Sequence, residues 1–312
     1  MNKMDSENFF QKRTPPSIVE GLEKNGYVIV PNVLSKEEVA IALEMFHTWR
    51  KSVKDLEFQH NALDPHGIYK FHEVGHQRHA WYVRTRPKVK QVFVDIWKYY
   101  GAEDPEDMIV SYDGSCYIEP ECKKKDKYWT HTDQSSPSGG EVDELKCIQG
   151  FVALTSNKER TFTCYESSHR IHATYFKEKG LKTTNNWNVI DESFTDMIKD
   201  KKRVLEVEAG SLVLWDSRTF HQNQYGKQGS GEERIVQYVC MLPRSSLDNK
   251  ESNQKKRIKY FEERRTTSHW PCPIKVNSKQ GRTFGDNRKL VHYWELPKPD
   301  LSDMMEDIMK LV

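Results

Sequence analysis

The 312-residue chain lacks several features that would place it in a specialised class of protein. It has no run of about 18 apolar residues, so the sequence predicts no transmembrane helix and no membrane partner. Its first residues hold no apolar core of a secretory signal, and we expect none. Lys and Arg (48) nearly balance Asp and Glu (46). The resulting net charge of +2 argues against a nucleic-acid coating protein.

Cysteine is scarce and unpatterned. The six cysteines form no C-x-x-C pair, which argues against zinc knuckles and redox motifs. We therefore expect reduced thiols and a cytoplasmic location. Only 36% of the residues are hydrophobic, yet 8 Trp, 14 Tyr and 13 Phe supply bulky core material. The composition predicts a folded globular protein.

No internal repeat or low-complexity block divides the sequence, so we expect a single domain. Residues 1–17 are predicted to form a polar tail, and residues 18–312 the domain. Within it we expect a helical part (18–106), a strand-rich core (107–245) and a helical C-terminal extension (246–312). Short strands between helical ends predict an α+β fold with a sandwich or barrel of strands.

Local patterns place the main elements. Ser35 and Glu38 fit a capping box at the start of a helix. The segments Met108–Tyr112 and Ser115–Ile118 are predicted strands, and the Asp-Gly turn between them predicts a hairpin. The remaining expected elements are strands at 27–30, 147–154, 162–165, 204–207, 212–215 and 235–242, and helices at 36–51, 87–100, 191–200, 249–265 and 301–311.

The sharpest chemical pattern is Trp-Thr-His-Thr-Asp at residues 129–133. On an extended segment, residues i and i+2 point to the same face, so His131 and Asp133 can converge on one ion. We propose His221, in the segment LWDSRTFHQN, as the third ligand. Two histidines and one carboxylate cover one face of an octahedral metal and leave three positions open. That arrangement is typical of non-haem Fe(II) oxygenases.

Two arginines are candidates for binding an anionic co-substrate. Arg234 lies 13 residues after His221 and opens the next predicted strand. On an antiparallel hairpin its guanidinium would point back toward the metal and hold the distal carboxylate of 2-oxoglutarate. Arg218, three residues before His221, could bind an anionic substrate or co-substrate, or form a structural ion pair.

The order of these motifs resembles the phytanoyl-CoA dioxygenase-like family of Fe(II)/2-oxoglutarate-dependent oxygenases. The matching stretches are 75–86 (GHQRHAWYVRTR), 109–114 (IVSYDG), 129–134 (WTHTDQ), 149–154 (QGFVAL), 166–170 (ESSHR), 209–223 (AGSLVLWDSRTFHQN), 234–238 (RIVQY) and 266–271 (TTSHWP). The resemblance implies a double-stranded β-helix (jelly-roll, cupin-like) core with flanking helices. It implies that iron is bound by His131, Asp133 and His221. It also implies that Arg234 binds 2-oxoglutarate, that O2 is the oxidant, and that Gln149 lies near the co-substrate.

One segment departs from the family pattern. The glycines expected before the Ser-His pair are missing from residues 159–166. The metal and Arg234 are untouched by this change, but the substrate side of the pocket is not, so family substrates are not carried over.

We expect a hydroxylase of a small organic molecule that releases succinate and CO2. The alternatives are a hydroxylase of a protein side chain or nucleobase, and a non-catalytic jelly-roll binding protein. A basic loop at residues 123–127 favours an anionic partner, whereas the near-neutral charge argues against nucleic acid. A zinc hydrolase ranks last because the chain has no H-E-x-x-H sequence.

Other histidines offer weaker patterns. His72, His76 and His79 would share one helical face and could form a second metal site, with a hydrogen-bonded loop as the favoured alternative. His169 and His172 could form a pair, but hydrogen bonding near the rim of the site is expected.

Overall fold

A computed structural model describes residues 15–53, 65–140, 144–277, 279 and 296–312. Helix α2 (Pro15–Asn25) begins inside the segment 1–17 that we expected to be a tail. The rest of that predicted tail, residues 1–14, lies outside the described residues.

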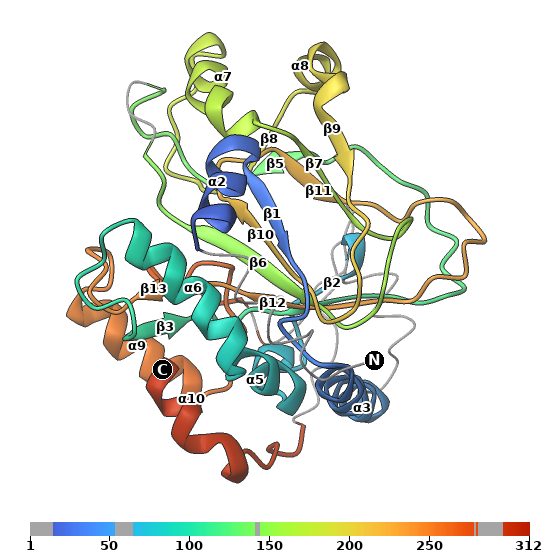
Figure 1. Cartoon of the computed structure of the whole chain (residues 1–312), viewed down its shortest axis with the longest axis vertical. Helices are drawn as coiled ribbons and strands as arrows, with labels where there is room; N and C mark the ends of the chain where they lie inside the picture. The colour runs from blue at the N-terminus through green and yellow to red at the C-terminus, as the bar shows by residue number, and fades with distance from the viewer. Residues whose placement is uncertain (1–14, 54–64, 141–143, 278, 280–295) are drawn as a thin grey trace.

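Two antiparallel sheets form the centre of the described structure (Figure 1). The large sheet has the strand order β1 (Tyr27–Val30), β10 (Leu212–Asp216), β6 (Ile148–Ala153), β12 (Arg234–Val239), β4 (Ser115–Ile118) and β2 (Ile68–Tyr69). The smaller sheet has the order β8 (Asn188–Val189), β5 (His131–Thr132), β11 (His221–Asn223), β7 (Phe162–Tyr165) and β9 (Lys202–Val204). A separate pair consists of β13 (Met241–Pro243) and β3 (Met108–Val110). The predicted mixture of helices with antiparallel strands is confirmed.

Helices gather mainly on one side of the large sheet, and α7 and α8 lie at the opposite end of the molecule (Figure 1). Their bounds are α3 Lys36–Ser52, α5 Arg78–Arg84, α6 Pro87–Tyr99, α7 His172–Glu178, α8 Glu192–Met197, α9 Glu251–Glu262 and α10 Met305–Leu311. Single 3₁₀ turns are η1 Pro65–Gly67, η2 Val74–His76, η3 Ser168–Ile171, η4 Lys199–Lys201 and η5 Ser302–Met304. Over the described ranges, none of the helices combines the length and apolarity that a bilayer crossing requires.

Helix α3 begins as its sequence predicts. The Ser35 hydroxyl accepts a hydrogen bond from the Glu38 amide at 3.2 Å, and the Glu38 carboxylate accepts one from the Ser35 amide at 2.8 Å. This confirms the capping box, which satisfies amide groups that a helix N-terminus otherwise leaves unpaired.

A buried aromatic cluster packs between the two sheets. Phe151 of the large sheet lies 5.9 Å, between ring centroids, from Phe162 of the smaller sheet. Phe162 in turn lies 4.8 Å from Trp215 and stacks on the His221 ring at 5.2 Å. All three aromatic side chains are buried, and removing such rings from water is the main stabilising term in a core of this kind. The same packing therefore fixes the position of His221.

The predicted hairpin between Met108–Tyr112 and Ser115–Ile118 is wrong. Strand β3 pairs with β13, and strand β4 pairs with β12 and β2. The Asp113 carboxylate accepts a hydrogen bond from the Gly114 amide at 2.6 Å, in a stretch without regular secondary structure or an assigned turn. The chain does not reverse at this point, because residues 108–118 run antiparallel to residues 234–243 on both sides of the Asp-Gly pair, from Met108 opposite Pro243 to Ile118 opposite Arg234.

The segment 18–106, expected to be helical, also contributes two strands to the large sheet. Strand β1 pairs with β10 and β2 pairs with β4, so these strands occupy the two edges of that sheet. The helical part and the strand-rich core are therefore joined by backbone hydrogen bonds as well as by side-chain packing.

Candidate metal centre

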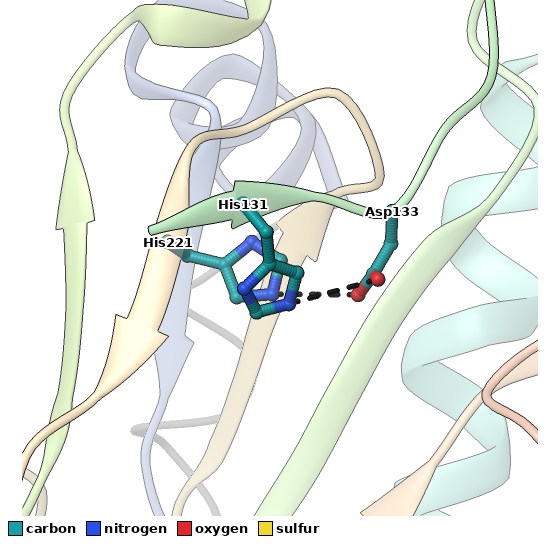
Figure 2. Close-up of side chains that lie close together, drawn as sticks. All are labelled: His131, Asp133 and His221. Carbon is teal, nitrogen blue, oxygen red and sulfur yellow. Dashed lines mark ion pairs between the residues drawn. The ribbon is translucent and has the colours of Figure 1, made fainter. Parts of the chain in front are cut away.

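His131, Asp133 and His221 form a compact cluster of candidate metal ligands (Figure 2). His131 and His221 are directly paired across β5 and β11, and Asp133 is the first residue after β5. Asp133 carboxylate oxygens lie 3.6 Å from His131 Nε2 and 3.4 Å from His221 Nε2. The ligand atoms all lie within 4.8 Å of one another, and all three side chains are buried. Within the described part of the chain, no other group of three or more His, Cys, Asp or Glu has this geometry.

Backbone carbonyls orient both imidazoles. His131 Nδ1 lies 3.1 Å from the Trp129 carbonyl oxygen, and His221 Nδ1 lies 2.8 Å from the Thr219 carbonyl oxygen. A carbonyl can only accept a hydrogen bond, so each Nδ1 is the protonated nitrogen. The Nε2 lone pairs are consequently turned toward Asp133, as in a histidine prepared to bind a metal.

The electrostatics of the cluster suit a cation. Burial lowers the pKa of His221, and the nearby His131 lowers it further. Burial raises the pKa of Asp133, but the two histidines outweigh this, so the pKa lies well below its usual value. The cluster therefore presents imidazole lone pairs together with a carboxylate anion, a donor set that divalent iron accepts.

Gln149 reaches the cluster from the other sheet. Its Nε2 donates a hydrogen bond to Asp133 Oδ2 at 3.1 Å. The Gln149 Oε1 atom is buried and has no hydrogen-bond partner among the described residues. The residue is thus in contact with a candidate ligand, and its predicted closeness to a co-substrate stays a prediction.

Arg234 is buried with no carboxylate partner in the described structure. Only 1% of its surface is exposed. Its guanidinium donates to the Arg160 carbonyl and to Asn223 Oδ1, each at 3.1 Å, while Nε has no partner. Asn223 lines the same small cavity as His131 and His221. A buried guanidinium compensated only by neutral acceptors is costly, so the position suits a ligand that brings a carboxylate.

Arg218 has a different environment. Its Nη2 lies 2.6 Å from Asp216 Oδ2, and the Arg218 amide also donates to the Asp216 carboxylate at 2.8 Å. Arg218 therefore forms an ion pair with Asp216, as in the structural alternative considered for it. A co-substrate role for Arg218 stays a prediction.

His72, His76 and His79 do not share the helical face predicted for them. His72 has a left-handed backbone (φ 55°), and His76 belongs to a separate 3₁₀ turn. His76 Nε2 lies 3.0 Å from the Arg265 carbonyl oxygen, and His79 Nε2 lies 3.1 Å from Ser115 Oγ. Because the chain bends at this point, the three imidazoles do not converge, and His76 and His79 follow the hydrogen-bonded alternative. The His72 Nε2 atom is buried without a hydrogen-bond partner in the described structure.

The other weak candidates lie outside the metal cluster. His169 Nε2 is 3.1 Å from the Glu23 carbonyl oxygen, and His172 Nε2 is 3.2 Å from the Gln134 carbonyl oxygen. In the basic loop, the Lys124 ammonium lies 5.7 Å from the centre of the Tyr225 ring. These contacts join loops and short helices around the sheets to one another, including the contact of His169 with helix α2.

Sequence reasoning missed His269. Its Nδ1 hydrogen-bonds the Asp113 carboxylate, and its Nε2 lies 4.0 Å from Asp133 Oδ2. Burial alone would lower the pKa of His269, but the Asp113 carboxylate overcomes this and raises it to about 8. The residue lies within the TTSHWP stretch at the end of the family resemblance, which is the only sequence signal that marked it.

The segment 159–166, which lacks the glycines of the resembled family, is held by two charged side chains. The buried Arg160 guanidinium donates to the carbonyl oxygens of Glu232 (2.6 Å), Pro120 (3.0 Å) and Cys122 (3.1 Å). The Glu232 carboxylate accepts hydrogen bonds from the backbone amides of residues 158–160 at 2.9–3.3 Å. Since the Arg160 carbonyl supports Arg234, this segment forms part of the surroundings of the site.

Comparisons with known proteins bear on the fold of the chain. No family model matches the chain. Ava biosynthesis cluster protein O of Aspergillus versicolor is 25% identical over 275 residues, which cover 80% of this chain and 83% of that protein. The non-haem alpha ketoglutarate dependent carbocyclase SnoK from nogalamycin biosynthesis is a structural neighbour with 16% identity and a TM-score of 0.50. The match covers 74% of this chain and 86% of SnoK. The fold is that of a non-haem iron, 2-oxoglutarate-dependent enzyme.

A second structural neighbour, the hypothetical protein JW0805 from Escherichia coli, has a TM-score of 0.60 at 11% identity, covering 86% of this chain and 78% of its own. At such identities the likeness concerns the fold alone. The likeness to SnoK supports the class of oxygenase fold and does not single out the phytanoyl-CoA dioxygenase-like family within it.

Proposed function

We propose that the protein is a non-haem Fe(II)- and 2-oxoglutarate-dependent dioxygenase. It hydroxylates a C–H bond of a small organic molecule and releases succinate and CO2. One observation carries the proposal: His131 and His221 of the buried His-Asp-His cluster line a small cavity together with Asn223. Asn223 Oδ1 accepts a hydrogen bond from Arg234, a buried arginine without a carboxylate partner in the described structure. The two packed antiparallel sheets support a double-stranded β-helix core within a single domain over residues 18–312.

The residues fit the two cofactors. His131, Asp133 and His221 would hold Fe(II) on one face and leave positions open for ligands. Arg234 would pair with the distal carboxylate of 2-oxoglutarate and satisfy its unpartnered Nε. When bound, the iron and 2-oxoglutarate supply the oxidising chemistry with O2.

The chain itself contributes orientation and a water-poor cavity. Gln149 fixes Asp133 Oδ2, and Asn223 fixes Arg234 Nη2. The Phe151 ring lies 5.2 Å from the Arg234 guanidinium and packs against it. Phe162, Trp215 and Ile68 supply apolar walls to the cavity. Such walls exclude bulk water, which strengthens the charge interactions inside.

A small-molecule substrate is supported by the named relatives. Ava biosynthesis cluster protein O and SnoK both carry names from biosynthesis of small molecules. A cytoplasmic location stays part of the proposal, and it agrees with six cysteines that are all buried and unbridged.

The test is an anaerobic titration of Fe(II) and 2-oxoglutarate into the apo-protein, read by the visible metal-to-ligand charge-transfer band. We expect a band in the wild type and no band in Asp133→Ala, which loses a metal ligand. Arg234→Ala should need at least about tenfold more 2-oxoglutarate for half-saturation, because a charge-assisted pair is lost. Arg203→Ala, at a side chain that is 42% exposed, is the matched control and should behave as the wild type. A wild-type protein that binds iron but gives no band at any 2-oxoglutarate concentration would refute the proposal.

A further inference from the structure

Among the described histidines that line the cavity, His269 is the one that the proposed function has not used. It lines the cavity together with His131 and His221, although it follows Asp133 by a long stretch of sequence. Its ring is held edge-on to Tyr238, with 5.2 Å between the centroids. Its position thus depends on contacts that form only in the folded chain.

Asp113 holds the imidazole in a single orientation. The Asp113 side chain is buried, with one carboxylate oxygen accepting from the Gly114 amide and the other bonded to His269 Nδ1. The opposite nitrogen, Nε2, therefore faces the metal cluster. Its distance of 4.0 Å from Asp133 Oδ2 is longer than a hydrogen bond, so a ligand atom beside the metal could contact Nε2 without displacing a protein partner.

The side chains between Arg234 and His269 trace one wall of the site. Arg234 Nη2 donates to Asn223 Oδ1 at 3.1 Å, and Asn223 Nδ2 donates to the Tyr238 hydroxyl at 3.0 Å. Tyr238 then contacts His269. A dicarboxylate with one end on Arg234 and the other on the metal must run along this wall, and its metal-binding end arrives next to His269.

We propose that His269, oriented by Asp113, is a positioning residue whose Nε2–H donates a hydrogen bond to the 2-oxo acid end of the co-substrate, with the Asp113 carboxylate on Nδ1 as the counter-ion of the doubly protonated imidazole. This inference rests on the proposed function, because it needs 2-oxoglutarate to lie between Arg234 and the metal. The hydrogen bond orients the oxygen atoms that approach the metal, so its loss changes both how tightly and in what geometry the co-substrate binds.

The experiment compares His269→Gln with His76→Gln in the full-length protein. His76 anchors the same part of the chain through the Arg265 carbonyl but does not line the cavity, so it reports a purely structural loosening. Each variant is titrated anaerobically with Fe(II) and 2-oxoglutarate, and its melting temperature is recorded. We expect His269→Gln to raise the half-saturating 2-oxoglutarate concentration about tenfold and to move the band maximum. His76→Gln should change the melting temperature alone.

Asp113→Asn provides a second variant if His269→Gln does not fold. The asparagine side chain would keep an oxygen that accepts from the Gly114 amide and would lose only the charged hydrogen bond to His269. We therefore expect a smaller rise in the half-saturating 2-oxoglutarate concentration than in His269→Gln. A band and half-saturation equal to those of the wild type in the folded variants would overturn the inference while the proposed function stands. Equal shifts in the His269 and His76 variants would overturn it as well. No band in the wild type would overturn both.

Discussion

Two arginines near the metal cluster carry the same charge and have opposite surroundings. Arg218 is paired with the Asp216 carboxylate, whereas Arg234 meets only neutral oxygen acceptors in the described structure. A guanidinium that is already neutralised gains little from a second carboxylate. At the scale of the single residue, the presence or absence of a carboxylate partner therefore distinguishes a structural arginine from one that is available to bind an anionic ligand.

Replacement of Arg218 by alanine tests this distinction. We expect the free energy of unfolding to fall by roughly 3 kcal/mol, because the buried Asp216 carboxylate loses its partner. The half-saturating 2-oxoglutarate concentration should not change. Urea denaturation gives the first quantity and the anaerobic titration gives the second. A raised 2-oxoglutarate requirement at unchanged stability would instead assign Arg218 to the co-substrate.

Residues on predicted strands were the ones that sequence reasoning could place. His131 and Asp133 lie two apart on an extended segment, so their common face follows from the geometry of a strand. Arg234 was placed by its position at the start of a strand. His269 was missed because it lies in an irregular loop, where no repeating pattern tells which way a side chain points. Its partner Asp113 was read only as part of a turn.

At the scale of the element, the segment 158–160 is arranged around one carboxylate. The Glu232 carboxylate accepts hydrogen bonds from the backbone amides of that segment and so fixes its position. The Arg160 carbonyl oxygen, in the same segment, accepts a hydrogen bond from Arg234. Burial raises the pKa of Glu232, but hydrogen bonds from these amides outweigh it and lower the pKa overall. The ionised Glu232 carboxylate therefore holds the turn at residues 158–160 together. Glycines, which the resemblance would lead us to expect in this region, are absent from it.

The Glu232→Ala variant should loosen this turn. We expect a several-fold rise in half-saturating 2-oxoglutarate, because the carbonyl that holds Arg234 is no longer fixed, together with a lower melting temperature. Glu206→Ala is the control, since Glu206 is 69% exposed and pairs only with Lys158 at 3.2 Å in the described structure. If Glu232→Ala lowers the melting temperature but leaves co-substrate binding intact, the segment has no part in placing Arg234.

The failed hairpin shows what local patterns leave out. An Asp-Gly pair favours a tight turn whatever the flanking strands do next. Whether these strands pair with each other depends on competing partners, and here β12 and β13 provide them from much later in the chain. By contrast, the capping box of α3 was predictable because all its hydrogen bonds fall within four residues.

At the scale of the whole molecule, several imidazoles are buried in the fold. Burial lowers the pKa of His72 to about 4 and the pKa values of His76 and His79 to about 3. In the unfolded chain these groups return to a pKa of about 6.5. Between these values the unfolded chain binds more protons than the folded one, so acid favours unfolding.

The free energy of unfolding should therefore fall as the pH drops from about 6.5 toward 4, and the contribution of these histidines is fully present above that range. The His79→Gln variant lacks one imidazole that the unfolded chain would protonate. The free energy of unfolding should therefore change less steeply with pH between pH 6 and 4, by about 1.4 kcal/mol per pH unit. Urea denaturation at a series of pH values measures it, with His47→Gln, at a partly exposed helix position, as the control. Parallel slopes for the wild type and His79→Gln would show that His79 is protonated in the folded protein.

The position of β11 in the middle of the smaller sheet has a consequence for biosynthesis. β5 and β7 leave the ribosome well before β11, which later fills the place between them and brings His221 to His131. Until then both strands keep a row of unsatisfied backbone groups facing the vacant place. A nascent or prematurely terminated chain that ends before β11 thus lacks His221 and carries exposed pairing edges, the feature that recruits chaperones or leads to aggregation.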